Sequence, residues 1–313
     1  MTRAFVFPGQ GSQTVGMGRD LADAFPVARH VFEEVDDALR QNLTRLIFNG
    51  PSEELTLTEN AQPALMAVSM AVMRVLEKEG GLDIASSAVF VAGHSLGEYS
   101  ALAATRAFSL ADAAWLLKSR GWAMQRAVPV GIGGMAALIG LDLDVARDVA
   151  QQAAEGDVCT AANDNAPQQV VVSGHIAAVE RALVLAAECG ARRSTMLPVS
   201  APFHCSLMKP AADAMVEALG RVTVNRPVLP LVANVTASRV EEPDEIRRLL
   251  VEQITGAVRW RESVLYLRDQ GVTGLVEIGA GKILTGLVKR ISRDLTCVAI
   301  NTPQDIEAFL KAN

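Results

Sequence analysis

The sequence predicts an α/β protein in which a large domain with a parallel sheet carries a smaller, inserted α+β domain. Its 313 residues lie near the upper size of a single hydrophobic core, so one large domain with a smaller subdomain is expected. Short apolar runs alternate with helical patterns near both ends of the chain, which is typical of parallel strands joined by helices. Between these two regions the order of the elements changes.

The elements of the large domain follow in chain order. We expect strands where short apolar runs stand between turn residues, and helices where apolar residues recur with a helical period. The expected strands are residues 4–7, 88–92, 229–235 and 274–279, and the expected helices are residues 20–40, 63–80, 96–108, 207–220, 244–254 and 283–292. Because strands and helices alternate, helices should cover a parallel sheet.

The middle of the chain has a different order of elements: strand, helix, strand, strand, helix, strand. These are expected at residues 135–140, 144–155, 158–163, 168–174, 177–190 and 194–200. This order is the ferredoxin-like signature. We therefore predict a large α/β domain of residues 1–127 and 200–313, and a ferredoxin-like insertion of residues 128–199.

The composition excludes several classes of protein. No apolar run reaches the roughly 20 residues of a membrane span, and the N-terminus lacks a secretory signal pattern, so we expect a soluble, cytoplasmic protein with no membrane partner. A net charge of −6 argues against nucleic-acid binding, which needs a basic face. The cysteines and histidines lack metal-site spacing, and glycine-rich segments 7–14 and 279–283 are not phosphate loops, so we expect no metal and no permanently bound cofactor.

Residues 93–97 read Gly-His-Ser-Leu-Gly, a G-x-S-x-G pattern between an expected strand and an expected helix. In this context the serine lies on a sharp turn that exposes its hydroxyl above the sheet. The flanking glycines let the backbone turn and a substrate approach. The pattern therefore predicts that Ser95 is a nucleophile; the alternative is a structural serine in a glycine-flanked turn.

The amide of Leu96 follows the serine at the N-terminus of the expected helix. An amide in this position can donate to the oxyanion of a tetrahedral intermediate, aided by the helix dipole. One such donor contributes about 3 kcal/mol to lowering the barrier. We therefore expect the Leu96 amide to be an oxyanion donor.

A serine hydroxyl is a poor nucleophile without a base, and the chain has four histidines. His30 lies in an expected helix, His94 should point away from the serine that it precedes, and His175 belongs to the insertion. His204 remains, in a loop that leads back into the large domain, where it could reach Ser95. A helix-start histidine without a catalytic role fits this position equally well.

Two other classes of serine enzyme share the G-x-S-x-G pattern. The expected sheet is α/β-hydrolase-like, but those enzymes usually place their acid and their histidine late in the chain, whereas about a third of this chain follows its last histidine. A patatin-like lipase needs an Asp-Gly pair, which the sequence lacks. Both classes are therefore disfavoured.

Several motifs occur together and in order. They are Phe7-Pro8-Gly9-Gln10-Gly11-Ser12-Gln13, Gly93-His94-Ser95-Leu96-Gly97-Glu98, Ser119-Arg120-Gly121, Pro202-Phe203-His204 and Glu277-Ile278-Gly279-Ala280-Gly281-Lys282. With this set the chain resembles the malonyl-CoA:acyl carrier protein transacylases, an acyltransferase family of fatty acid and polyketide synthesis. The resemblance covers essentially the whole length, including the insertion.

The resemblance implies catalytic roles at five positions. Ser95 would be the nucleophile and His204 the general base and then acid, and the backbone amides of Gln10 and Leu96 would form the oxyanion hole. The family lacks a third carboxylate; instead the backbone carbonyl of Gln253 would orient the histidine.

The resemblance also implies substrate-binding residues. Arg120 would hold the free carboxylate of a malonyl group, which a guanidinium can bind through two parallel hydrogen bonds. Taken from the residues alone, a solvated helix arginine fits this position. Phe203 matches the malonyl-type pattern, and Asn163 matches a site residue, with Asn165 as the alternative register.

The expected reaction transfers a malonyl group from coenzyme A to the phosphopantetheine thiol of an acyl carrier protein. The alternatives are the same chemistry in a polyketide or malonate decarboxylase system, and a serine hydrolase or thioesterase. An acidic carrier needs a basic patch, and a solvated basic face is the alternative role for each candidate. The candidates are Arg192, Arg193, Lys209, Lys289, Arg290 and Arg293.

Overall fold

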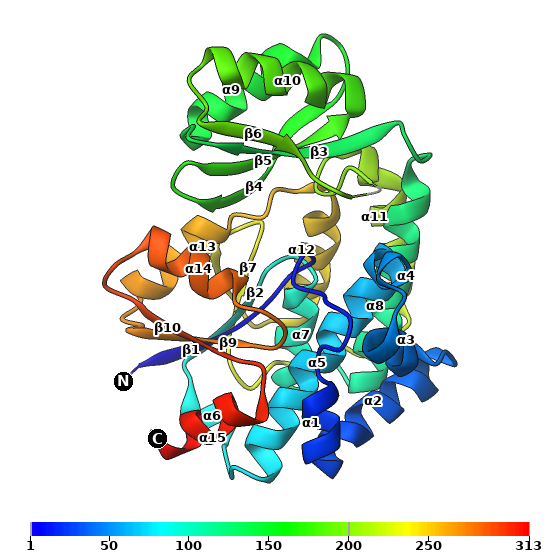
Figure 1. The fold of residues 1–313 in the computed structure, drawn as a ribbon, viewed down its shortest axis with the longest axis vertical. Coiled ribbons are helices and arrows are strands. Elements are labelled where there is room, and N and C mark those ends of the chain that lie inside the picture. Colours follow the sequence, from blue (N-terminus) through cyan, green and yellow to red (C-terminus); the bar gives the residue numbers. More distant parts are fainter. Residues whose placement is uncertain (1, 200, 313) are drawn as a thin grey trace.

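Two β-sheets organise the molecule, and in Figure 1 they lie one above the other. The computed structural model describes residues 2–199 and 201–312. The larger sheet has the strand order β10-β9-β1-β2-β7-β8, and the smaller sheet has the order β4-β5-β3-β6. The strands of the larger sheet are β1 (Arg3–Phe7), β2 (Phe90–Gly93), β7 (Leu231–Ala233), β8 (Ser238–Val240), β9 (Gly274–Ile278) and β10 (Thr296–Ile300).

The larger sheet is parallel from β10 to β7, and β8 pairs antiparallel with β7 at its edge. Alternate residues of the central strand β1 face opposite sides, as the two-residue period of a strand requires. Phe5 and Phe7 belong to the larger hydrophobic core, and Ala4 and Val6 belong to a second core on the other face. Both faces of β1 are therefore buried.

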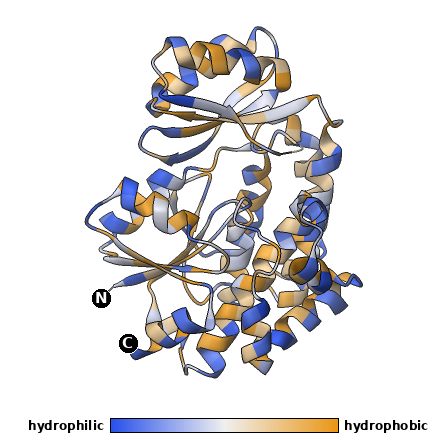
Figure 2. Cartoon of the chain, viewed as in Figure 1, coloured by the Kyte–Doolittle hydropathy of each residue, from blue (hydrophilic) through white to orange (hydrophobic). Residues whose placement is uncertain are grey.

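Helices cover both faces of this sheet. The second core is formed with α13 (Trp260–Asp269) and α14 (Ile283–Ile291). The larger core includes residues of the remaining helices of the large domain. These are α1 (Arg19–Ala24), α2 (Pro26–Leu39), α3 (Leu43–Asn49), α4 (Ser52–Thr56), α5 (Thr58–Lys78), α6 (Ile84–Ser87), α7 (Gly97–Ala104), α8 (Leu110–Ala127), α11 (Lys209–Gly220), α12 (Pro243–Thr255) and α15 (Pro303–Lys311). Figure 2 shows hydrophobic and hydrophilic residues interspersed along these helices, as one buried face requires.

The smaller sheet is antiparallel throughout. Its strands are β3 (Gly133–Ile139), β4 (Cys159–Ala166), β5 (Gln169–His175) and β6 (Arg193–Met196), with α9 (Leu143–Ala154) after β3 and α10 (Ile176–Glu188) after β5. The predicted ferredoxin-like order of strands and helices is confirmed, and so is the α/β class of the large domain with its parallel sheet. A short 3-10 helix, η1 (Ser206–Met208), follows the return to the large domain.

Some sequence-based expectations need correction. The helix expected at residues 20–40 is two helices, because Phe25 adopts an extended conformation and Pro26 starts α2 at its first position. The expected parallel sheet also has the antiparallel strand β8. The domain limits at 127/128 and 199/200 stay predictions, and the limits at residues 1, 200 and 313 lie outside the described residues.

The small domain is tied to the large one through β4. The Asp164 amide donates to the Val258 carbonyl at 2.9 Å, and the Val258 amide donates to the Ala162 carbonyl at 2.8 Å. The Asp164 carboxylate, which is almost fully buried, receives bonds of 3.0 and 2.9 Å from Nε of Arg261 on α13. These contacts fix β4 beside the large domain. Among the described residues no helix is long and apolar enough to cross a membrane.

Candidate active site

Ser95 lies on a tight turn between β2 and α7, as the G-x-S-x-G pattern predicts. Its φ of 52° is in the left-handed region. A Cβ atom on Gly93 would lie 1.9 Å from a backbone carbon of Gly97, and one on Gly97 would lie 2.3 Å from the Phe7 carbonyl oxygen. Only glycine fits at these two positions, because backbone atoms occupy the space. The turn directs the Ser95 hydroxyl into a cavity.

Asn234, the residue after β7, holds this turn. The Ser95 amide donates to Oδ1 of Asn234 at 2.8 Å, and Nδ2 of Asn234 donates to the Gly93 carbonyl at 2.7 Å. Asn234 is fully buried. It therefore satisfies the two backbone groups that flank the turn, and nothing in the sequence pattern pointed to it.

His204 reaches Ser95 from the loop before η1. Its Nε2 lies 2.8 Å from Ser95 Oγ, and its Nδ1 lies 2.8 Å from the backbone carbonyl oxygen of Gln253 on α12. A carbonyl oxygen only accepts hydrogen bonds, so Nδ1 carries the proton. Nε2 is then free to accept the serine proton. The carbonyl of Gln253 therefore fixes the tautomer that a general base requires.

The His204 imidazole is neutral at neutral pH. Burial, and then the positive charge of Arg120, lower the pKa of His204 to about 3. The other histidines lie in different surroundings. Nε2 of His94 donates to Oδ1 of Asn165 at 2.8 Å, and Nδ1 of His175 accepts from the Val158 amide in the small domain. The structure thus brings only His204 to the Ser95 hydroxyl among the described histidines.

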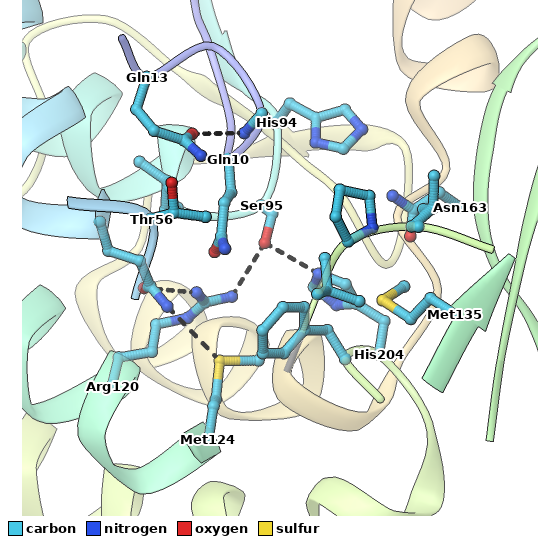
Figure 3. A pocket seen from close by; sticks show the side chains of 17 residues that line it. Gln10, Gln13, Thr56, His94, Ser95, Arg120, Met124, Met135, Asn163 and His204 are labelled. Carbon is cyan, nitrogen blue, oxygen red and sulfur yellow. Dashed lines mark hydrogen bonds between the residues drawn. The ribbon is translucent and has the colours of Figure 1, made fainter. Parts of the chain in front are cut away.

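Arg120, on α8, is almost fully buried with 1% of its surface exposed, so it is not a solvated helix arginine. Its Nη1 donates to Oε1 of Gln62 at 2.7 Å. Its Nη2 donates to Ser95 Oγ at 3.0 Å and to Oε1 of Gln253 at 2.8 Å. Figure 3 shows Arg120 and His204 both directed at the Ser95 hydroxyl. A buried cation therefore lies within hydrogen-bond distance of the predicted nucleophile.

Two side chains behind Arg120 were missed by sequence reasoning. The side chain of Gln253, whose carbonyl was expected to matter, also donates from Nε2 to the Ser95 carbonyl at 3.0 Å and to Oε2 of Glu98 at 2.5 Å. Burial raises the pKa of Glu98 to about 8, although hydrogen bonds from Asn234 and Gln253 and the charge of Arg120 lower it. A glutamate after the G-x-S-x-G pattern was visible in the sequence, but its partners were not.

A cavity of about 410 Å³ surrounds Ser95 between the two domains' residues. The predicted site residues that line it are Gln10, Ser95, Leu96, Arg120, Asn163, Phe203 and His204. Oδ1 of Asn163 is buried and has no hydrogen-bond partner among the described residues, whereas Asn165 is bound to His94. The structure therefore places Asn163, rather than Asn165, at the cavity.

The two residues whose backbone amides are predicted as oxyanion donors, Gln10 and Leu96, both lie at the cavity. Leu96 stands at the N-terminal end of α7, where amides have no acceptor within their own helix. Gln10 lies in the turn after β1, and its Oε1 accepts a bond of 2.8 Å from the Thr58 hydroxyl. Both residues border the cavity at Ser95. The site thus combines a serine, a neutral imidazole and a buried cation, with the two predicted backbone donors at its border, which is a set suited to acyl transfer.

Two of the six basic candidates, Lys209 and Arg290, lie on separate helices. Lys209 begins α11 and pairs with Asp213, whereas Arg290 lies on α14. In Figure 1 α11 and α14 lie on opposite sides of the molecule. Arg192 donates to Oε1 of Gln168 at 2.6 Å, and Arg290 donates to Oε1 of the next residue, Gln169. Arg192 and Arg290 therefore approach the same β4–β5 turn.

Proteins of known sequence are similar to this chain over nearly its whole length. The acyl transferase domain matches residues 4–303. The chain is 47% identical to the malonyl CoA-acyl carrier protein transacylase of Escherichia coli strain K12 over 98% of both chains. It is 46% identical to that of Bacillus subtilis strain 168, over 98% of this chain and 96% of the relative.

Solved structures agree with the sequence comparison. The acyl-carrier-protein-S-malonyltransferase of Bartonella henselae has a TM-score of 0.97 and 54% identity, covering 100% of this chain and 99% of that one. A malonyl-transacylase in complex with a type II PKS acyl-carrier protein has a TM-score of 0.96 and 43% identity over 100% of both chains. The resemblance predicted from the motifs is confirmed: this chain belongs to the malonyl CoA-acyl carrier protein transacylase family of acyl transferases.

Proposed function

We propose that this chain transfers a malonyl group from coenzyme A to the phosphopantetheine thiol of an acyl carrier protein, through an ester on Ser95. One observation carries the proposal: the buried Arg120 guanidinium donates to the nucleophilic oxygen itself. A cation so close to the attacking atom suits an acyl group that ends in a carboxylate near its thioester carbonyl, as malonyl does. The names of the relatives support the same cargo and the same carrier.

The first half-reaction loads the enzyme. Nε2 of His204 takes the proton from Ser95 Oγ as the oxygen attacks the thioester carbonyl. The amides of Gln10 and Leu96 donate to the oxyanion of the tetrahedral intermediate. When the intermediate collapses, the carbon–sulfur bond breaks and His204 returns the proton to the departing coenzyme A thiol.

The second half-reaction moves the malonyl group from Ser95 to the carrier. The carrier thiol gives its proton to His204 and attacks the Ser95 ester, and the ester bond breaks with return of the proton to Ser95 Oγ. Loading and unloading use the same residues, so the kinetics should be ping-pong. The chain itself supplies the nucleophile, the base and the oxyanion donors, so we propose that no bound cofactor is needed and that malonyl-CoA is a substrate.

Arg120 has a second role in this scheme. In the free protein its Nη2 donates to Ser95 Oγ at 3.0 Å and so withdraws electron density from the nucleophile. A malonyl carboxylate that takes over this donor leaves the serine oxygen free to attack. Loading is therefore coupled to the arrival of a carboxylate, so malonyl is favoured over uncharged acyl groups. Transfer of malonyl to the carrier would supply extender units for fatty acid synthesis.

Intact mass spectrometry tests this function. After malonyl-CoA is added, the wild-type mass should increase by one malonyl group, and addition of malonyl-free carrier protein should remove it. Ser95→Ala should remain unlabelled, whereas Ser100→Ala, a buried serine on the same helix whose hydroxyl has no partner among the described residues, should label normally. Loss of the label to water as fast as to the carrier would indicate a hydrolase or thioesterase instead.

A further inference from the structure

Glu98, in the first turn of α7, is buried three residues after the nucleophile and touches neither the Ser95 hydroxyl nor His204 in the described hydrogen bonds. Both of its carboxyl oxygens accept hydrogen bonds. Oε1 accepts from the Asn234 amide, and Oε2 accepts from Nε2 of Gln253 at 2.5 Å. The carboxyl group therefore stands between a backbone donor, which cannot rotate, and a side-chain amide, which can.

The Gln253 side-chain amide has only one orientation that satisfies its neighbours. Its Nε2 faces three acceptors, Glu98 Oε2, the Ser95 carbonyl and, at 3.4 Å, Oδ1 of Asn234. Its Oε1 faces one donor, Nη2 of Arg120. The same Nη2 also donates to Ser95 Oγ. A planar guanidinium directs the two hydrogens of one nitrogen at fixed angles, so the position of Gln253 Oε1 sets how Arg120 is aimed at the serine.

We propose that Glu98 is a positioning residue for malonyl selection: it fixes the orientation of the Gln253 amide, and through that amide it aims Arg120 at the acyl site. This inference rests on the proposed function, since it assigns the aim of Arg120 to the choice of a carboxylate-bearing acyl group. Glu98 acts without contact with the substrate.

An amide at position 98 cannot replace the carboxyl group. Whether or not one carboxyl oxygen carries a proton, both oxygens keep a lone pair and can accept, whereas the amide nitrogen of glutamine only donates. In Glu98→Gln, the nitrogen of the new side-chain amide must face either the backbone N–H of Asn234 or Nε2 of Gln253. Because the Asn234 amide is fixed, Gln253 is the group that turns.

Rotation of the Gln253 amide changes what Arg120 meets. Its nitrogen would then face Nη2 of Arg120, donor against donor, and its oxygen would face the Ser95 carbonyl. Arg120 would lose one of its acceptors and shift from Ser95. The loss of one charge-assisted hydrogen bond corresponds to a factor of about ten or more in binding.

The test compares loading of malonyl-CoA and acetyl-CoA by mass spectrometry, because acetyl lacks the carboxylate. In Glu98→Gln we expect malonyl loading to fall about tenfold relative to acetyl loading. The matched control is Glu277→Gln, another buried carboxylate, which accepts bonds from Leu284 and Thr285 at the start of α14. Among the described hydrogen bonds it has none with Gln253. Its malonyl-to-acetyl ratio should equal that of the wild type, and an unchanged ratio in Glu98→Gln overturns the proposal.

A second variant covers the case in which Glu98→Gln does not fold. Gln253→Met removes the amide but keeps the backbone carbonyl that orients His204, so its malonyl-to-acetyl ratio should fall to a similar degree. In the double variant, Glu98→Gln should change the ratio no further, because Glu98 acts through that amide. An unchanged ratio in Gln253→Met, or additive effects in the double variant, refutes this role. A wild-type protein that takes up no malonyl group would instead contradict the proposed function.

Discussion

Ser95 and His204 both adopt left-handed backbone conformations, with φ of 52° and 59°, and their side chains meet at 2.8 Å. Such a conformation costs a residue with a side chain about 1–2 kcal/mol. Strain of this kind persists where the surrounding structure fixes it, as the Asn234 bonds do at Ser95. The hydrogen bond at the centre of the site therefore joins two strained positions.

Relief of this strain should raise stability at position 95. Ser95→Gly should unfold at a higher temperature than Ser95→Ala, because glycine accepts positive φ. The difference in their free energies of unfolding should be about 1 kcal/mol. At Ser100, inside α7, the order should reverse, with Ser100→Ala more stable than Ser100→Gly. Thermal unfolding of the four variants decides the matter, and the same order at both positions would argue against strain at Ser95.

Arg120 should decide which acyl group is loaded. Arg120→Ala removes the buried guanidinium, so malonyl loading should fall by a factor of about 100, the scale of two charge-assisted hydrogen bonds. Loading of acetyl-CoA should fall less, which improves the relative use of uncharged groups. Arg126→Ala, on the same helix with its guanidinium over the Trp122 ring, serves as the control. Equal losses for both acyl groups would contradict the carboxylate-binding role.

The lowered pKa of His204 predicts a pH dependence of stability. A histidine titrates near 6.5 in the unfolded chain, whereas burial and Arg120 lower the pKa of His204 to about 3 in the folded protein. Between these values the unfolded chain binds a proton that the folded protein does not, so the free energy of unfolding falls as the pH falls from 6.5 towards 3. His204→Gln lacks this proton-binding group.

Melting curves in this window test the assignment. On acidification from about pH 7 to about pH 4, the melting temperature of the wild type should fall further than that of His204→Gln. A parallel decline of both proteins would show that His204 is not the group that binds the proton on unfolding.

The ion pair between Arg261 and Asp164 should keep the cleft closed to water. Arg261→Met leaves the buried Asp164 carboxylate unpaired, which should destabilise the protein by about 3 kcal/mol. Because Asp164 adjoins Asn163 at the cavity, β4 should loosen there and the malonyl ester should hydrolyse faster. The half-life of the loaded enzyme without carrier, followed by mass spectrometry, measures this effect.

A neighbouring pair provides the control for that experiment. Glu262, in the first turn of α13, pairs with Arg259, the residue just before that helix, and is partly exposed. Glu262→Gln should therefore leave the ester half-life near the wild-type value. If Arg261→Met had the same half-life as Glu262→Gln, the inter-domain pair would have no part in excluding water.

The fold could be predicted in its main features because they depend on local patterns. The apolar strand at residues 4–7 and the helix after Ser95 are encoded by periodicity and by glycines. Strands β8 and β10 were not predicted: β8 has three residues with little apolar signal, and β10 is half-exposed at a sheet edge. Edge strands depend on pairing with a neighbour, which a local pattern does not contain.

The site was predictable where chemistry restricts the residue type. Ser95 and the candidate His204 followed from the need for a nucleophile and a base, and Arg120 followed from the family motif. Glu98 and Asn234 escaped notice because their importance depends on contacts across 136 positions of sequence. The burial of Arg120 also could not be read from α8, since polar partners from other helices make it possible.

The position of α14 leads to a prediction about the carrier. Lys289 and Arg290 lie in its last turn, and Arg290 reaches the β4–β5 turn at Gln169. Lys209, on α11, is paired with Asp213. An acidic carrier that docks at α14 should bind more weakly to Lys289→Glu/Arg290→Glu, and its binding should respond less to salt, because exposed charges are screened within about 10 Å at 0.1 M salt.

Steady-state kinetics distinguish carrier docking at α14 from docking at α11. The double charge reversal should raise the KM for the carrier while leaving the rate of loading from malonyl-CoA unchanged, since α14 contributes no residue to the Ser95 cavity. Lys209→Glu should leave the carrier KM unchanged. The opposite pattern would move the docking surface to α11, and because the phosphopantetheine arm must reach Ser95 from wherever the carrier binds, it would also change the side from which the thiol enters.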